Sequence, residues 1–332
     1  MKTMSIGNSG LTASVLTLGT WSIGGGDWWQ NNDDEASIKT IHRALELGIN
    51  LIDTAPIYGL GHSEEVVGKA LAGGKRDKAL IATKGTFQWD TEVGRYVYDV
   101  DGHRVFVDHS YGTIIKDCED SLKRLGTDYI DIYYLHNPAR DTVKYPVADT
   151  VRALQDLKKQ GKIRAIGLSN VQVEHIESHI AAGCELDIVQ RRYSLLESDV
   201  EKDILPLCEK HGLSLHAYTP LERGILTGTV KADQVPPKGD ARDGQFWWKS
   251  ENLPDAVEFV RNLGDLCEKN HCSPMELAIA YLRSKPLVNV ICGARRPAQI
   301  EVDVPAAELV LAPEDVAEIR RRVGVLKAKH PV

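Results

Sequence analysis

Several chemical signatures are missing from this chain of 332 residues, and each absence removes a class of protein. The six cysteines form no CxxC pair, which argues against a zinc ribbon or a dithiol redox site. No HExxH, Walker A or GxSxG sequence is present, and the glycine run 24–26 does not form a GxGxxG between a strand and a helix. We therefore expect no metal site and no Rossmann fingerprint.

Long apolar runs and an excess of positive charge are also missing. No window reaches the apolar length of a transmembrane helix, and residues 1–7 lack the apolar segment of a signal peptide, so we expect a cytoplasmic protein. The 40 basic and 47 acidic side chains give a formal charge of −7, which offers no broad attraction to a polyanion. Neither nucleic acid nor membrane is an expected partner, and the chain is expected to be a monomer or a homo-oligomer.

Segments with the periodicity of β-strands alternate along the chain with segments that have helical periodicity. Residues 2–7 and 11–16 alternate apolar and polar side chains around the turn Asn8-Ser9-Gly10, as in a β-hairpin. Eight β-rich runs follow, each succeeded by a longer segment, and the clearest helical periodicity begins at residues 34, 110, 147, 173, 200 and 273. The eight runs are Leu16–Gly19, Asn50–Thr54, Ala79–Lys84, Ile130–His136, Ile163–Ser169, Asp187–Tyr193, Leu213–Tyr218 and Val288–Gly293.

This order predicts an α/β fold, a closed (β/α)₈ TIM barrel with an N-terminal β-hairpin, rather than an open doubly wound sheet. Because no composition break divides the chain, residues 1–332 are expected to form a single domain. Two connections, Gly85–Asp108 and Val230–Pro254, are too long for simple βα turns and follow strand ends, so they are candidate substrate loops. The first contains a hairpin signal at residues 100–103, and the charged tail after Ala312 indicates a terminal helix.

Four ionisable residues lie at or just beyond the ends of three successive predicted strands. They are Asp53, Tyr58, Lys84 and His136. A barrel brings such ends to one mouth, although each residue alone is more often a cap or a satisfied polar group. Together they suggest Tyr58 as general acid/base on a carbonyl oxygen, with Lys84 lowering the tyrosine pKa. Asp53 would hold Lys84, and His136 would orient the carbonyl.

At this point the sequence resembles the aldo-keto reductases. Their pattern of a DTAxxYG segment, a strand-ending lysine and an LHxP histidine occurs here in order, at residues 53–59, 84 and 135–138. Residues 19–26, 162–170, 218–228 and 293–296 are similar to the branch containing bacterial general-stress and inositol-operon reductases. The resemblance covers nearly the whole chain and implies that the four residues form the family's catalytic tetrad.

The resemblance also implies a nicotinamide cofactor. Ser169, Asn170 and Gln190 would hold the carboxamide, Tyr218 would stack on the ring, and the segment from Thr219 to Gly224 would wrap the pyrophosphate. The full set of expected cofactor-binding residues is Thr20, Trp21, Ser169, Asn170, Gln190, Tyr218, Thr219, Leu221, Arg223, Gly224, Gly293, Arg295, Arg296, Gln299 and Asp303.

The segment from Gly293 to Pro297 supports an anion site independently of the family. It lies between a strand and a helix, so it offers backbone N–H groups, a helix N-terminus and the guanidinium groups of Arg295 and Arg296. The arginines favour the 2′-phosphate of NADP. The family's usual Glu-Asn near the adenine is Val302-Asp303 here, and an aspartate there is compatible with the unphosphorylated ribose of NAD.

Substrate contacts are expected from the mouth loops. The family's LHxPD pattern continues here as Ala139-Arg140, so Arg140 or Asp141 is a candidate for contact with the substrate. Trp21, Trp89 and Trp247 are further candidates, because tryptophan faces stack on sugar rings, although such residues can equally pack a loop onto its neighbour.

The sequence therefore predicts an NADP-dependent oxidoreductase of carbohydrate metabolism that reduces the aldehyde or ketone of a small polar, sugar-derived substrate, or oxidises the alcohol. One alternative is a barrel lyase in which Lys84 forms a Schiff base, although Asp53 favours the charged amine. Another is a cofactor-loaded regulatory subunit that binds a second protein.

Overall fold

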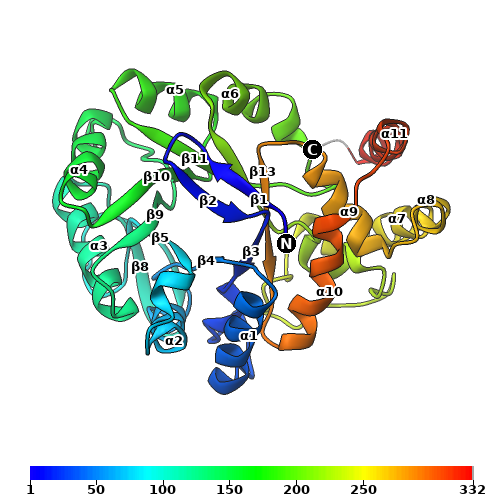
Figure 1. Ribbon diagram of the computed structural model, residues 1–332, viewed down its shortest axis with the longest axis horizontal. Coiled ribbons are helices and arrows are strands. Elements are labelled where there is room, and N and C mark those ends of the chain that lie inside the picture. Colours follow the sequence, from blue (N-terminus) through cyan, green and yellow to red (C-terminus); the bar gives the residue numbers. More distant parts are fainter. Residues whose placement is uncertain (331–332) are drawn as a thin grey trace.

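The computed structural model describes residues 1–330, and its centre is a closed barrel of eight parallel strands (Figure 1). Neighbouring strands follow the chain order except at the closure, where the last strand pairs with the first. The strands are β3 (Leu16–Gly19), β4 (Leu51–Asp53), β5 (Leu80–Gly85), β9 (Ile130–Leu135), β10 (Ile163–Ser169), β11 (Leu186–Arg192), β12 (Ser214–Tyr218) and β13 (Val288–Gly293). The predicted (β/α)₈ barrel is confirmed.

Helices surround the barrel as the predicted alternation requires. They are α1 (Asp34–Glu46), α2 (His62–Leu71), α3 (Tyr111–Leu125), α4 (Val147–Lys159), α5 (Val173–Ala181), α6 (Ile204–His211), α7 (Leu253–Arg261), α8 (Gly264–Lys269), α9 (Pro274–Arg283), α10 (Pro297–Glu308) and α11 (Pro313–Lys329). Local signals fix several boundaries: the Asp33 carboxylate caps α1, the Ser110 hydroxyl caps α3, and Gly126 ends α3 in a left-handed conformation. No helix among residues 1–330 is long and apolar enough to span a membrane.

The N-terminal hairpin closes the end of the barrel where the strands begin. Strands β1 (Thr3–Ile6) and β2 (Leu11–Ser14) lie across the ring in Figure 1. Ile6 and Leu11 pack with Leu51, Ile132 and other side chains that fill the barrel interior. The hairpin therefore leaves only the opposite end of the barrel for a binding site.

Two elements at that opposite end correspond to the predicted long loops. The first loop contains a small sheet of β6 (Phe87–Gln88), β7 (Arg95–Val100) and β8 (His103–Val107). Its predicted hairpin turn is present, with left-handed φ angles at Asp101 and Gly102, as a two-residue turn requires. The second loop passes through a 3₁₀ turn, Phe246–Trp248, before α7.

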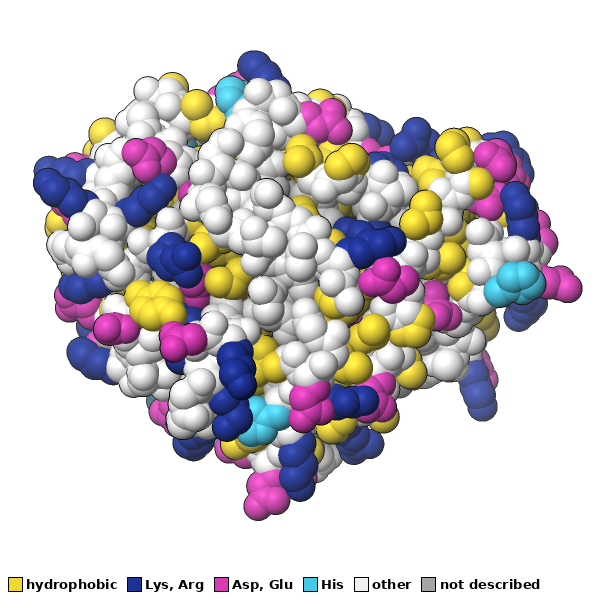
Figure 2. Space-filling model, viewed as in Figure 1, with side chains coloured by type: hydrophobic (Ala, Val, Ile, Leu, Met, Phe, Trp, Pro, Cys, Tyr) yellow, Lys and Arg dark blue, Asp and Glu magenta, His cyan; other side chains and the backbone are white. Residues whose placement is uncertain are grey.

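On the face that carries the hairpin, basic and acidic side chains are interspersed (Figure 2). No strongly charged patch of one sign is visible on this face, in agreement with the balanced composition.

Candidate active site

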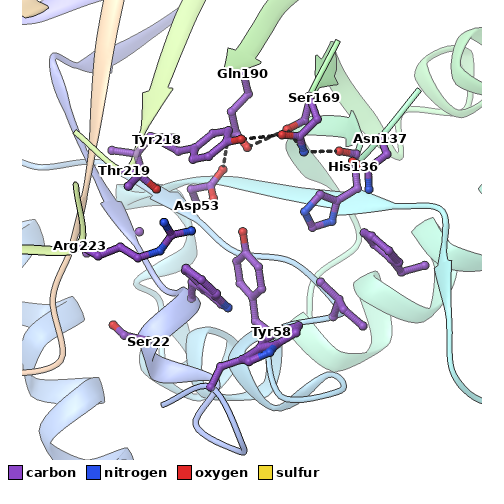
Figure 3. A pocket seen from close by; sticks show the side chains of 18 of the residues that line it. Ser22, Asp53, Tyr58, His136, Asn137, Ser169, Gln190, Tyr218, Thr219 and Arg223 are labelled. Carbon is purple, nitrogen blue, oxygen red and sulfur yellow. Dashed lines mark hydrogen bonds between the residues drawn. The ribbon is translucent and has the colours of Figure 1, made fainter. Parts of the chain in front are cut away.

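Three of the four predicted tetrad residues, Asp53, Tyr58 and His136, line one cavity at the C-terminal ends of the barrel strands (Figure 3), and Lys84 lies behind them, bound to Asp53. Asp53 ends β4, Lys84 lies in β5, His136 follows β9, and Tyr58 lies between β4 and α2. Lys84 Nζ donates to Asp53 Oδ1 at 2.7 Å, to the Thr54 carbonyl at 2.7 Å and to Tyr58 Oη at 3.4 Å. The imidazole of His136 lies edge-on to the Tyr58 ring, with 6.1 Å between ring centroids. A phenol, an ammonium, a carboxylate and an imidazole thus share one site.

Burial sets the protonation states of this cluster. It raises the pKa of Tyr58 well above its usual value, with a further contribution from the Asp53 carboxylate. Burial lowers the pKa of Lys84, and Asp53 opposes that shift. The sequence predicted a Tyr58 pKa lowered by Lys84, whereas the net shift is upward, because desolvation of the phenolate dominates. Tyr58 is therefore a protonated phenol at neutral pH.

His136 is held neutral by its surroundings. Burial and the positive charge of Lys84 hold the pKa of the imidazole well below its usual value. Its Nδ1 atom has no hydrogen-bond partner among the described residues, and Phe87 packs against the ring at 4.9 Å between centroids. A neutral imidazole can still donate one N–H to an oxygen placed between it and Tyr58.

The tetrad opens into a cavity of about 1130 Å³ that extends from β9 to the start of α10. This volume slightly exceeds the range of about 300–1,000 Å³ that is usual for small-molecule sites. The predicted site residues that line it are Trp21, Asp53, Tyr58, His136, Arg140, Ser169, Asn170, Gln190, Tyr218, Thr219, Leu221, Arg223, Gly224, Gly293, Arg295, Gln299 and Asp303.

Five predicted site residues do not line this cavity: Thr20, Lys84, Trp89, Trp247 and Arg296. Thr20 and Lys84 lie immediately behind the wall and hydrogen-bond to Asp53, through its carbonyl and its carboxylate respectively. Arg296 is exposed, in front of α10.

The predicted substrate contacts of Trp89 and Trp247 are not what the structure shows. Trp247 is buried, and its ring packs edge-on to Phe246 and to His330 beyond α11. Trp89 packs against the guanidinium group of Arg124 on α3. Both side chains pack their loops against the outer part of the molecule, because burial of a large apolar ring is more favourable in free energy than its exposure to solvent.

Beside the tetrad, three strands present a connected polar wall, drawn in Figure 3. Gln190 Nε2 donates to Asp53 Oδ2 at 2.7 Å, and Ser169 Oγ donates to Gln190 Oε1 at 3.3 Å. Tyr218 Oη donates to Asn170 Oδ1 at 2.6 Å, and Asn170 Nδ2 donates to the His136 carbonyl at 2.9 Å. An amide and a hydroxyl group therefore lie directly next to the proposed proton donor.

The segment after β12 adopts an unusual backbone. Thr219, Glu222 and Arg223 have φ angles of 56°, 48° and 51°, which L-residues adopt only when the surroundings enforce them. The buried carboxylate of Glu222 provides that support by accepting hydrogen bonds from Arg192 and Ser194. Arg223 donates to Gln245, but its buried Nε has no partner in the described chain. Such a curved segment with an unsatisfied guanidinium donor suits an anionic group.

At the far end of the cavity lies the turn from β13 into α10. The backbone N–H groups of Arg295 and Arg296 both donate to Gln299 Oε1, at 2.9 and 3.2 Å. A phosphate could use these donors only after Gln299 moves, which sequence analysis did not anticipate. Arg295 donates to the Gln30 carbonyl and lies over the Trp29 ring.

The other wall carries side chains that sequence analysis did not assign. They are Phe87, Arg95, Tyr98, His109, Lys144 and Tyr145, among others. Several of them come from the loop 85–108 or directly follow it. The length of that loop therefore indicated a contribution to the cavity. The alternation of apolar and polar residues did not reveal which face of β7 and β8 points into the cavity.

Comparisons with known proteins agree with this geometry. The profile of the Aldo/keto reductase family matches residues 15–323. The chain belongs to this family.

Individual aldo-keto reductases are similar over their whole length. The chain is 38% identical to the NADH-specific methylglyoxal reductase of Escherichia coli K12, over 98% of this chain and 100% of the relative. It is 35% identical to the aldo-keto reductase YhdN of Bacillus subtilis 168, over 96% of this chain and 92% of the relative. A solved glycerol dehydrogenase from Gluconobacter oxydans superposes with a TM-score of 0.86 at 37% identity, covering 99% of this chain and 96% of that one.

Proposed function

We propose that this aldo-keto reductase transfers a hydride between a nicotinamide dinucleotide and a small polar carbonyl compound, with Tyr58 as general acid/base. The observation that supports this most strongly is the position of Tyr58 Oη, 3.4 Å from Lys84 Nζ and beside a neutral His136. We further propose that residues 1–332 act as one domain in the cytoplasm.

Polar groups that suit a dinucleotide line the cavity both beside the tetrad and farther along it. Gln190, Ser169 and Asn170 offer amide and hydroxyl groups beside the tetrad, and Arg223 offers an unpartnered donor farther along. When bound, the nicotinamide ring supplies the hydride. The chain's own residues would hold the carboxamide at one end and the phosphates along residues 219–224.

Side chains of the protein would bind the carbonyl oxygen and transfer the proton to it. His136 and Tyr58 together bind and polarise the carbonyl oxygen, and Tyr58 donates its proton as that oxygen gains charge. Its raised pKa keeps the phenol protonated beforehand, which suits reduction. Lys84 then stabilises the phenolate through its hydrogen bond, while Asp53 holds the ammonium in place.

The Schiff-base alternative is disfavoured by the same contacts. All three N–H donors of Lys84 are engaged, and the side chain is fully buried behind the cavity wall. A lysine in this position has no free amine to present to a carbonyl.

For the cofactor we propose NAD as the preferred form and NADP as the second candidate. Arg295 lines the cavity and supports the NADP predicted from the sequence. Arg296, the other half of that prediction, is exposed outside the lining. The 38% identical relative from Escherichia coli is named as specific for NADH, which supports NAD.

For the substrate we propose a short polar or sugar-derived aldehyde or ketone. Trp21 and Trp28 provide aromatic walls, and Arg140 lies at the same rim. The relatives named for methylglyoxal and for glycerol act on small polar molecules of this kind.

The test is reduction of a panel of such carbonyls, followed by NADH and NADPH absorbance. Tyr58→Phe should lower kcat/KM by at least about a thousandfold, because the proton donor is lost. Tyr111→Phe is the matched control, since its hydroxyl binds Asp156 on the outer surface. Equal activity of the wild type and Y58F would contradict the proposal, and tight cofactor binding without any turnover would favour a regulatory subunit.

A further inference from the structure

The cavity continues past His136, away from the segment proposed to hold the phosphates of the dinucleotide. In Figure 3, His136 and Asn137 lie on one side of Tyr58, and Arg223 lies on the other side. Three cations line the cavity beyond His136, and all three are exposed at its rim. These residues, called the rim cations below, are Arg95, Arg140 and Lys144.

Strand pairing connects the first rim cation to the tetrad. Phe87 of β6 packs against the His136 ring, with 4.9 Å between centroids. Phe87 lies directly opposite Val107 of β8, and Val107 lies directly opposite Arg95 of β7. Because directly opposed residues share one face of a sheet, these three side chains form a row, and all of them line the cavity. Two strand spacings put the Arg95 backbone roughly 10 Å from that of Phe87.

A second rim cation approaches the same region from the loop after β9. His109 Nε2 donates to the Asn137 carbonyl at 2.8 Å, and its ring packs against Tyr145 with 5.6 Å between centroids. Lys144 Nζ lies over the Tyr145 ring, 5.0 Å from its centroid. Burial lowers the pKa of His109, and the nearby charge of Arg95 adds to that shift. The two loops therefore bring their positive charges to one part of the cavity.

The rim cations have no acidic partner in the part of the chain that the structure describes. Within residues 1–330, no carboxylate forms an ion pair with any of them, and Arg95 makes one long hydrogen bond of 3.4 Å to the Tyr96 carbonyl. Arg104 on the adjacent strand β8 differs, because it pairs with Glu92 at 2.8 Å. The donors of the rim cations are thus available to a ligand.

The nearby carboxylates are engaged within their own loops. Asp141 also lines the cavity, and its Oδ1 accepts the backbone N–H groups of Val143 and Lys144 at 3.1 and 2.9 Å. Asp108 Oδ2 accepts the Tyr145 hydroxyl at 2.9 Å. Three positive charges against one engaged carboxylate leave an excess of positive charge on this wall of the cavity.

We propose that the carbonyl substrate carries an oxyanion, a carboxylate or a phosphate, which the rim cations bind while the carbonyl oxygen lies between Tyr58 and His136. This inference rests on the proposed function as a carbonyl reductase. Guanidinium groups bind both oxyanions through paired N–H donors, and the ammonium group adds a point charge. The two strand spacings between Phe87 and Arg95, shortened by the reach of the arginine, favour an anion about five bonds from the carbonyl carbon.

The experiment compares anionic carbonyl compounds with uncharged analogues, using the full chain with NADH and with NADPH. D-Glucuronate is paired with D-glucuronamide, and glyceraldehyde 3-phosphate is paired with glyceraldehyde. For at least one pair, kcat/KM of the anionic member should be at least about tenfold higher, and added salt should reduce that preference. A preference within the first pair identifies a carboxylate, and a preference within the second pair identifies a phosphate.

Variants of the rim cations test whether these residues cause the preference. The triple variant Arg95→Gln, Arg140→Gln and Lys144→Gln should bring the ratio of kcat/KM for the anionic and the neutral member close to one. Since all three side chains are exposed, the variant is expected to fold, and circular dichroism checks this. Arg104→Gln is the matched control, because it removes one positive charge from β8 outside the cavity lining and should leave the ratio unchanged.

The outcomes separate this inference from the proposed function. Equal or faster reduction of the neutral member in both pairs, or an unchanged ratio in the triple variant, would overturn the anionic substrate. Reduction of no carbonyl compound at all, charged or neutral, would instead overturn the proposed function as a whole.

Discussion

Two buried aspartates, Asp131 and Asp53, lie at opposite ends of the barrel. At the closed end, Asp131 at the start of β9 accepts hydrogen bonds from Arg76, Arg164 and the Ile81 N–H group. At the open end, Asp53 holds Lys84 and Gln190. In a TIM barrel the first location serves stability and the second serves chemistry.

Asp131→Asn should therefore lower stability without affecting the cofactor site. Two arginines lose their anionic partner, and we expect the free energy of unfolding to fall by about 2–4 kcal/mol. Chemical denaturation measures the loss, and NAD⁺ titration measures the affinity. Asp128→Asn, at an exposed position nearby, should change stability by less than about 0.5 kcal/mol. A weakened NAD⁺ affinity in D131N would contradict this separation.

At the scale of elements, the cavity wall depends on contact between two loops. The Asp27 N–H donates to Asp101 Oδ1 at 2.7 Å, and the Asp101 N–H donates to Asp27 Oδ2 at 2.8 Å. This pair joins the β3–α1 loop to the tip of the β7–β8 hairpin. Trp28 and Tyr98 pack edge-on at 5.9 Å between centroids across the same junction, and both line the cavity.

Asp101→Ala should loosen this junction. Because the affected rings lie on the proposed substrate wall, KM for the carbonyl should rise by about threefold to tenfold while NAD⁺ affinity stays unchanged. Gly26→Ala should act in the same direction, since a Cβ there would lie 2.4 Å from an Asp101 carboxylate oxygen. Steady-state kinetics with Asp99→Ala, on the same hairpin, as control would test this, and an unchanged KM in both variants would refute it.

At the scale of the whole molecule, buried histidines and carboxyl groups respond to acid in opposite senses. Burial lowers the pKa of His109, His136, His179 and His216, so below about pH 6.5 the unfolded chain binds protons there that the folded chain does not. Stability is lost as the pH falls through this range. Burial raises the pKa of Asp117 to about 7, so its neutral form favours the folded state increasingly between pH 7 and pH 4.

Single variants should separate these contributions. Between pH 6.5 and pH 5, His179→Asn should lose stability less steeply than the wild type, by up to about 1.4 kcal/mol per pH unit. The reason is that its unfolded chain no longer binds the proton that His179 takes up on unfolding. Asp117→Asn should lose stability more steeply by a similar amount. Urea denaturation at several pH values provides the measurement, and parallel curves for all three proteins would show that these groups do not titrate as inferred.

The sequence by itself determined the barrel, the order of its strands and the meeting of Asp53, Tyr58, Lys84 and His136. These features follow from local periodicity and from the rule that parallel strand ends share one mouth, so neighbouring residues suffice to predict them. The hairpin turn at Asp101-Gly102 was predictable for the same reason, because its chemistry is local.

Only the tertiary structure decided the packing of Trp89 and Trp247 on outer helices, the raised pKa of Tyr58, and the engagement of the Arg295 N–H group by Gln299. Each depends on which atoms surround a side chain, and those atoms come from elements distant in the sequence, such as α3 beside Trp89 and the chain after α11 beside Trp247. Burial and partnership are properties of the assembled barrel, and no pattern along the chain encodes them directly.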